Sequence, residues 1–165
     1  MSSKLTTLNL TQAKRKIMDL IARRDHTEKE LRKKLSLRCE SDTVEQAIEW
    51  AKEQNWLAKP EHIQERVVQM LHNKGKGHRL INHKLRELGL KTIATDADLE
   101  LQKAKKLVKA KWSREDFKNL DYKEKQKLTA KIVRFLVSRG FDSSVISKVL
   151  KKDLTDKDLN YDEEF

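Results

Sequence analysis

The sequence has few of the residues that interrupt or cross-link a chain. Its 165 residues include one cysteine, one proline and four glycines, and aromatic residues make up only 5%. Cys39 has no partner for a disulfide within the chain, and such sparse cysteine usage is typical of a reducing compartment. No apolar run approaches 18 residues, and no secretory signal opens the chain. These absences predict a cytoplasmic and largely helical protein.

Charged residues are abundant and unevenly distributed. They make up 38% of the chain, and the formal net charge at pH 7 is +11. Residues 153–165 contain six acidic residues and one lysine, so residues 1–152 carry a net charge of +16. A body this basic is typical of a protein that binds a polyanion, either nucleic acid, an acidic protein groove or an anionic membrane. A membrane is the weakest candidate, because no helix combines a broad apolar face with a basic one outside a plausible core.

One pattern occurs three times along the chain. Each copy has an apolar helical stripe, a basic residue at a corner, and a second apolar stripe at positions i and i+4. Such self-similarity predicts a repeat architecture, which usually works through an extended surface. The equivalent residues are Ile17, Leu20, Ile21, Arg24, Leu31 and Leu35 in copy one, Val67, Met70, Leu71, Lys74, Ile81 and Leu85 in copy two, and Ile132, Phe135, Leu136, Arg139, Ile146 and Leu150 in copy three.

The few helix breakers fall at the expected corners of the repeats. Gly75 and Gly77 lie between the two stripes of copy two, and Gly140 lies at the same corner of copy three. Gly89 follows the second stripe of copy two, where a helix C-cap glycine belongs. Pro60 opens the first helix of copy two, where its missing N–H costs nothing. The rest of the chain is therefore expected to be helical.

Capping residues agree with this interpretation. Thr27 with Glu30, and Asp42 with Glu45, are spaced as capping boxes, and Asp142 can cap a further helix. The resulting fold class is all-α. Helices are expected at about 11–25, 27–37, 43–56, 60–73, 78–88, 97–112, 122–139 and 142–152. They group into a flexible N-terminus at 1–10, three-helix repeats at 11–57, 58–96 and 97–152, and an acidic disordered tail at 153–165.

Basic residues on outward helical faces and at the corners are the candidate binding residues. In copy one, Lys29, Arg32 and Lys33 lie together on the outer face of the second helix. An ordinary solvated face is the alternative for any single copy, but a corner base in all three copies favours a polyanionic partner. The second helices become less basic along the chain, so the strongest contacts are expected in copies one and two. The candidates are Arg24, Lys29, Arg32, Lys33, Lys74, Lys76, Arg79, Lys103, Lys106, Lys109, Arg139 and Lys148.

The sequence gives little support for major-groove reading, a phosphate-binding loop, metal binding or catalysis. The third helix of copy one exposes Glu45, Glu49 and Glu53, whose carboxylates would repel phosphates and argue against sequence-specific reading of the major groove. The glycines at 75 and 77 lack the spacing of a phosphate-binding loop, the histidines form no i, i+4 metal pair, and no nucleophile motif is present. No cofactor, metal or catalytic residue is therefore predicted. Trp50 and Trp56 are interpreted as packing residues, with base stacking as the alternative.

Four segments resemble the RecX regulatory proteins of bacteria. They are "RRDHTEKELRKKL" at 23–35, "NWL" at 55–57, "NKGKGHRLINHKLRELGL" at 73–90 and "KIVRFLVSRGF" at 131–141. The resemblance spans roughly residues 12–151, and the first segment is its most specific part. The chain departs from the family pattern at Ala58, Lys59, Lys76 and His78. These departures affect the expected details of the copy-two corner and not the resemblance to the family.

The resemblance implies three tandem three-helix repeats in an elongated, curved molecule. It also implies a monomer that binds the RecA recombinase filament and inhibits its extension, ATP hydrolysis, strand exchange and co-protease activity. Single- and double-stranded DNA, bound without strong sequence preference, are further implied partners. A general helical nucleic-acid-binding protein without recombinase contact is the alternative, and an enzyme is a distant third. The acidic tail either folds back on the basic surface or aids solubility.

Overall fold

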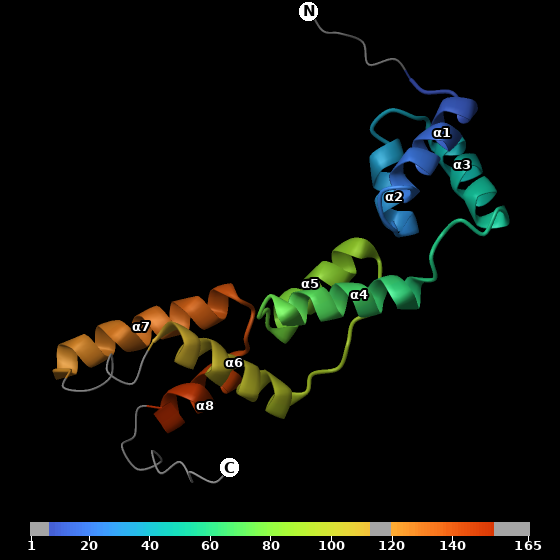
Figure 1. Ribbon diagram of the computed structural model, residues 1–165. Coiled ribbons are helices and arrows are strands. Elements are labelled where there is room, and N and C mark those ends of the chain that lie inside the picture. The colour runs from blue at the N-terminus through green and yellow to red at the C-terminus, as the bar shows by residue number, and fades with distance from the viewer. Residues whose placement is uncertain (1–6, 113–119, 154–165) are drawn as a thin grey trace, which may run out of the picture. The chain divides into compact units, whose positions relative to one another are not determined.

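A computed structural model describes residues 7–112 and 120–153, and in these residues the regular structure is entirely helical (Figure 1). This confirms the all-α prediction, whereas the number of repeats and the elongated shape stay predictions. Most of the expected tail lies outside the described residues. The elements are α1 (Leu10–Ile21), α2 (Glu28–Leu35), α3 (Ser41–Glu53), α4 (Pro60–Asn73), α5 (His78–Leu88), α6 (Ala97–Lys111), α7 (Tyr122–Ser138) and α8 (Ser143–Asp153).

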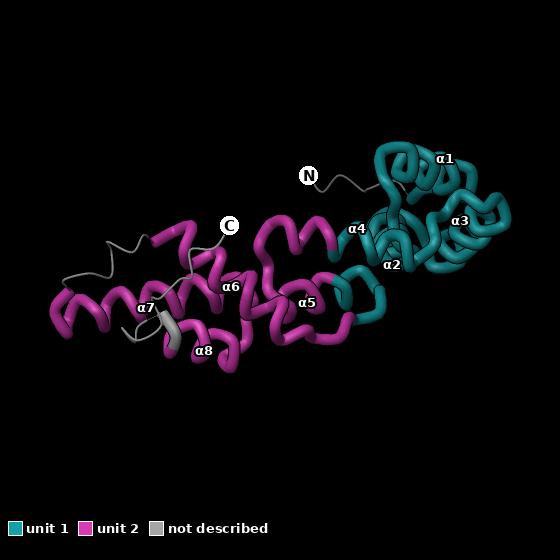
Figure 2. The backbone as a smooth tube through the Cα atoms, turned by 60° about the horizontal axis from the view of Figure 1, so that its bottom comes forward, with its two compact units in different colours: residues 1–68, 85–92 teal, residues 69–84, 93–165 magenta. Residues whose placement is uncertain are grey.

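Two compact units divide the chain, and Figure 2 shows them in different colours. Unit 1 comprises residues 1–68 and 85–92, and unit 2 comprises residues 69–84 and 93–165. Helices α4 and α5 therefore each contribute one end to unit 1 and the other end to unit 2.

The core of unit 1 is a packing of α1, α2 and α3. Its buried residues recur at three- and four-residue spacing, as one face of each helix requires. Each valine, leucine or isoleucine among them contributes about 1.5–3 kcal/mol when fully buried, and Trp50 packs against the same cluster. The cluster consists of Ala13, Ile17, Leu20, Leu31, Leu35, Val44, Ala47, Ile48 and Ala51.

The core of unit 2 combines α6, α7 and α8. Helix α6 precedes the corner of copy three in sequence, yet Ala104 and Val108 are buried together with side chains of α7 and α8. Phe141 is the largest side chain in this core and is almost fully buried. The remaining members of the cluster are Ile132, Leu136, Val145, Ile146 and Val149.

The corners of copies two and three pack backbone against backbone within unit 2. The N–H of Gly77 donates to the carbonyl of Arg139 at 2.7 Å, and the N–H of Arg79 donates to that of Gly140 at 3.2 Å. A Cβ atom on Gly77 would overlap the Gly140 carbonyl, and one on Gly140 would overlap Leu80. Gly140 also has φ +85°, which favours glycine. Sequence analysis placed these glycines at corners without predicting that the corners touch.

The observed helix ends confirm most of the capping residues predicted from the sequence and contradict one of these predictions. Thr27 and Glu30 form the predicted capping box of α2, and Gly89 follows α5 with φ +74°. The predicted box at Asp42 is wrong, because α3 begins two residues earlier than expected, at Ser41 after Glu40, without a side-chain cap. Asp42 consequently lies in the first turn of the helix, where its carboxylate still faces favourable partial charge.

One predicted core residue is also misplaced. Met70 belongs to the apolar stripe of copy two, but 43% of it is exposed. Leu71, Ile81 and Leu85 of the same copy are buried as predicted.

Candidate partner-binding surfaces

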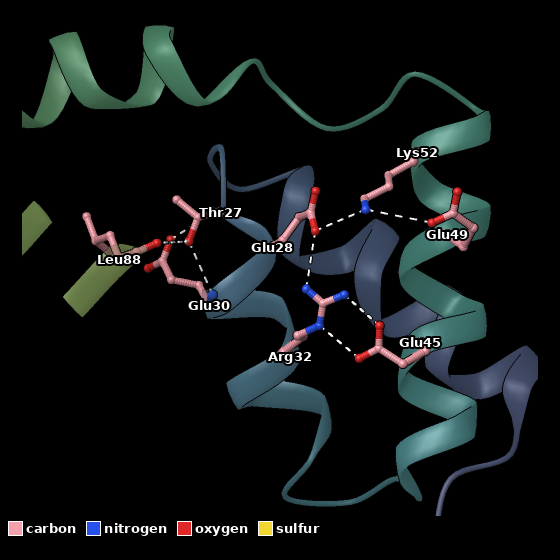
Figure 3. A network of polar contacts seen from close by, with 8 residues as sticks. All are labelled: Thr27, Glu28, Glu30, Arg32, Glu45, Glu49, Lys52 and Leu88. Atoms are coloured by element: carbon pink, nitrogen blue, oxygen red, sulfur yellow. Dashed lines mark hydrogen bonds and ion pairs between the residues drawn. The ribbon is translucent and has the colours of Figure 1, made fainter. Parts of the chain in front are cut away.

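Side chains at the start of α2 hold the end of α5 within unit 1. The Thr27 hydroxyl donates to the Leu88 carbonyl at 2.7 Å and accepts from the Glu30 N–H at 3.2 Å (Figure 3). The Lys29 Nζ donates to the Arg86 carbonyl at 2.8 Å. Carbonyls in the last turn of a helix lack intrahelical donors and carry partial negative charge. Lys29, a predicted contact residue, therefore has a structural role in this unit.

Arg32 is the centre of an ion-pair network between α2 and α3, shown in Figure 3. Its Nε and Nη2 donate to the two carboxylate oxygens of Glu45 at 2.8 and 2.6 Å, and its Nη1 lies 3.2 Å from Glu28. Lys52 lies 3.1 Å from the same Glu28 oxygen and 3.7 Å from Glu49. The ion pairs of this network neutralise basic residues with acidic residues of α2 and α3. From the sequence alone these residues are interpreted as two separate exposed faces, one basic and one acidic.

The titration behaviour of this network follows from its hydrogen bonds. The hydrogen bond with Glu45 raises the pKa of Arg32 above its already high ordinary value, and the same bond lowers the pKa of Glu45. The hydrogen bond with Glu28 raises the pKa of Lys52. In each of these three shifts the oppositely charged partner favours the charged form of the group.

The corner bases also have partners inside the chain. Arg24 Nη2 lies 2.7 Å from Glu30 Oε1. Burial would raise the pKa of Glu30, but hydrogen bonds from Arg24 and the Thr27 N–H outweigh it, and the pKa is lowered. Arg139 Nη1 donates to the Lys74 carbonyl, just beyond the end of α4, at 2.9 Å. Among the three corner bases, only Lys74 has an exposed side chain with no hydrogen-bond or ion-pair partner in the described part of the chain.

Lys103 lies in the interior of unit 2. Only 13% of its side chain is exposed, and its ammonium forms an ion pair with Glu100, which is 3% exposed as a residue. The other oxygen of Glu100 accepts from the N–H of His78, the first residue of α5, at 2.9 Å. Lys103 Nζ also donates to His72 Nδ1 at 3.0 Å. Glu100, on α6, thus accepts a hydrogen bond at the N-terminus of α5, where a carboxylate is favoured. Lys103 neutralises the charge of Glu100.

The other predicted residues remain accessible to different degrees. Lys33, Lys106, Lys109 and Lys148 are exposed, and Lys76 is half-buried. Arg79 is exposed, with its Nε 3.6 Å from Asp142. Four of the twelve candidates lie in unit 1 and eight in unit 2. Those candidates that the structure engages most tightly are Arg24, Lys29, Arg32, Lys103 and Arg139.

Sequence analysis missed the basic face of α7. Lys123, Lys127 and Lys131 follow one another at four-residue spacing, and with Arg134 they form one exposed row, called the α7 stripe below. Ile132 and Leu136 are buried on the opposite side. Within residues 7–112 and 120–153, no ion pair is found for these four bases. A search for regularly spaced bases would have found them, since sequence analysis weighed only second helices, corners and residues 97–112.

Neither a metal-binding group nor a membrane-spanning helix is found in the part of the chain that the structure describes. There, no group of three or more histidine, cysteine or acidic side chains is placed to hold a metal ion. The described helices also include none that is long and apolar enough to cross a membrane.

These features define an all-helical protein that combines three-helix packings with exposed basic faces, and its sequence is similar to that of known regulators. The family described as "RecX, first three-helix domain" matches residues 13–50. Regulatory protein RecX of Ralstonia nicotianae is 31% identical over 142 residues, which cover 84% of this chain and 86% of that protein. The RecX protein of Clostridioides difficile is 29% identical over 166 residues, covering 92% of this chain and 70% of that protein. The chain therefore belongs to the RecX family of regulatory proteins.

Solved structures show the same fold. The crystal structure of RecX from Lactobacillus salivarius has a TM-score of 0.65 and 18% identity, covering 88% of this chain and 96% of that one. A second crystal structure of regulatory protein RecX has a TM-score of 0.63 and 20% identity, covering 86% and 73%. At these identities the likeness concerns the fold, and it agrees with the family assignment made from sequence.

Neighbouring bases on α2 should respond differently to charge reversal. Arg32→Glu would place a third carboxylate beside Glu28 and Glu45, so we expect a thermal midpoint several degrees below that of the wild type. Lys33→Glu changes an exposed site, where substitutions usually alter stability by about 0.5 kcal/mol or less. Thermal unfolding followed by circular dichroism compares the two. Equal midpoints for both variants would show that the Arg32 network contributes nothing to the fold.

The stability of unit 2 should depend on pH through His72. Burial lowers the pKa of His72 and the nearby Lys103 lowers it further, against a smaller opposing effect of Glu100. The unfolded chain therefore binds this proton more readily, and the free energy of unfolding should fall as pH drops below the ordinary histidine value of 6.5. In His72→Gln, chemical denaturation should show a shallower loss between about pH 7.5 and 5.5. An unchanged pH profile would exclude His72 as the titrating group.

Proposed function

We propose that this protein is a negative regulator of the RecA recombinase, which binds the RecA–DNA filament and inhibits its extension, ATPase, strand exchange and co-protease activity. Membership of the RecX family is the observation that carries the proposal, and it covers most of the chain. The proposed action is by binding, without turnover of a substrate. Single- and double-stranded DNA within the filament are the proposed additional partners, bound without strong sequence preference.

The charges of the described residues support a filament that contains DNA as the target. The exposed bases Lys33, Lys106 and Lys148 belong to different helices and Lys74 follows α4, so positive charge is spread over both units. Phosphate contacts of this kind position a protein without reading sequence. A filament also presents the same surface at regular intervals, which suits a chain with repeated helical units.

A second candidate function is general nucleic-acid binding without contact to the recombinase. The α7 stripe favours it, because four exposed bases without a carboxylate partner among the described residues can contact a phosphate backbone directly. The two candidates differ in salt dependence. Binding to naked DNA should weaken steeply as salt rises, whereas binding that needs RecA should persist on filaments at salt where naked DNA is no longer bound.

The proposed function predicts inhibition of filament activity. Addition of the full chain to RecA filaments on single-stranded DNA, at amounts near stoichiometric with RecA, should lower the rate of ATP hydrolysis and shorten filaments seen by electron microscopy. A basic protein of similar size and charge serves as control, since it also competes for DNA. Unchanged hydrolysis and filament length would contradict the proposal, and equal effects of the control would leave only general DNA binding.

A further inference from the structure

The α7 stripe is costly for the helix that carries it. Like charges four residues apart on a helix destabilise it by about 0.2–0.5 kcal/mol per pair, and Lys123, Lys127 and Lys131 form two such pairs. Elsewhere the chain sets acidic residues against its bases, as Glu28 and Glu45 do for Arg32. On α7 the only acidic residue is Glu124, and its carboxylate accepts from the Asp121 N–H. The row of bases therefore has no evident role in the stability of α7.

The spacing of the stripe suits a chain of repeated negative charges. A step of four residues along a helix is about 6 Å, so the three lysines present charges at regular intervals along one side. Their side chains are exposed and flexible, which lets each ammonium adjust to a separate phosphate. The next residue in the same four-residue series is Phe135, and Arg139 follows it.

A pair of aromatic rings adjoins the end of the stripe. The Trp112 and Phe135 rings lie edge to face with centroids 5.3 Å apart, and both residues are half-buried against the core of unit 2. Lys111 Nζ lies 4.5 Å from the Phe135 centroid and 5.1 Å from the Trp112 centroid, and the Arg139 guanidinium lies 4.8 Å from the Phe135 centroid. Cations therefore lie over the rings of an aromatic pair whose two residues are each partly exposed.

We propose that the α7 stripe and the Trp112–Phe135 pair form a contact surface for single-stranded nucleic acid. The lysines contact successive phosphates, and an unpaired base stacks on the accessible part of the ring pair between Lys111 and Arg139. Aromatic rings with adjacent cations are the usual means of binding single strands without sequence preference. An acidic peptide would form ion pairs with the lysines, but its carboxylates would not stack on the aromatic rings. This assignment rests on the proposed function, in which DNA within the filament is a partner. It places the main nucleic-acid contact in copy three.

The test uses the full chain and naked oligonucleotides, so its outcome is separate from any effect on RecA. Binding of labelled oligothymidylate is measured over about 50–200 mM salt for the wild type and for Lys123→Gln/Lys127→Gln/Lys131→Gln. Loss of three phosphate contacts should reduce the log–log salt slope by about 2, since each contact to a single strand contributes about 0.7. The thermal midpoint should stay equal or rise slightly, because like-charge pairs are removed.

A matched variant separates position from net charge. Arg15→Gln/Lys16→Gln/Lys34→Gln removes the same charge from exposed sites of unit 1, and its salt slope should remain close to that of the wild type. If both triple variants lose affinity and slope equally, the protein responds to net charge alone and the assignment to α7 is overturned. If neither variant changes binding, the assignment is overturned as well.

The ring pair is tested with an abasic oligomer of the same length and charge. The wild type should bind oligothymidylate about fivefold or more tightly than the abasic oligomer, and Phe135→Leu, which keeps an apolar side chain in the core, should abolish the preference. Poly-glutamate is the third ligand. Wild-type binding of the abasic oligomer or poly-glutamate as tight as that of oligothymidylate would overturn the proposal, even if Phe135→Leu failed to fold. Inhibition of RecA filaments could still hold in that case.

Discussion

Unsatisfied carbonyl groups at helix ends limit which basic residues of this protein are available to a partner. The last turns of α4 and α5 expose such carbonyls, and donors from other helices satisfy several of them. Lys29 and Thr27 do so for α5, and Arg139 does so just beyond α4. These side chains connect segments far apart in the sequence, and their removal would leave polar groups without partners. A basic residue in this chain is therefore first a candidate for internal structure and only then for binding.

The same constraint explains how charge is distributed inside each unit. Arg32 in unit 1 pairs with Glu45 of the neighbouring helix α3, and Lys103 in unit 2 pairs with Glu100 of its own helix, where most of the Lys103 side chain is buried. A charge in a poorly hydrated position must be paired. The α7 stripe differs from these pairs, because it keeps like charges together and lies on the side of α7 away from Ile132 and Leu136. Its location shifts the proposed nucleic-acid contact toward copy three.

Sequence alone predicts the helices of this fold well, because apolar spacing and glycine corners are local signals. Leu31, Leu35, Ile81 and Leu85 are buried as the periodicity requires. Side-chain partners are a different matter, since Arg32 meets Glu45 only after α2 packs against α3. Lys103 appears in sequence as one of several lysines, and its burial depends on where Glu100 and His72 are placed. The α7 stripe, by contrast, follows from a local signal, the four-residue spacing of Lys123, Lys127 and Lys131, and could have been predicted from the sequence.

The bases of this chain divide into internally engaged and accessible groups. Lysine acetylation measured by mass spectrometry tests this division most directly. In the free protein, Lys103 should react slowly, whereas Lys123, Lys127 and Lys131 should react at the rate of exposed lysines. Addition of a single-stranded oligonucleotide should slow the three α7 lysines and leave Lys103 unchanged. Equal reactivity of Lys103 and the α7 lysines in the free protein, or protection by DNA spread evenly over all lysines, would contradict the account.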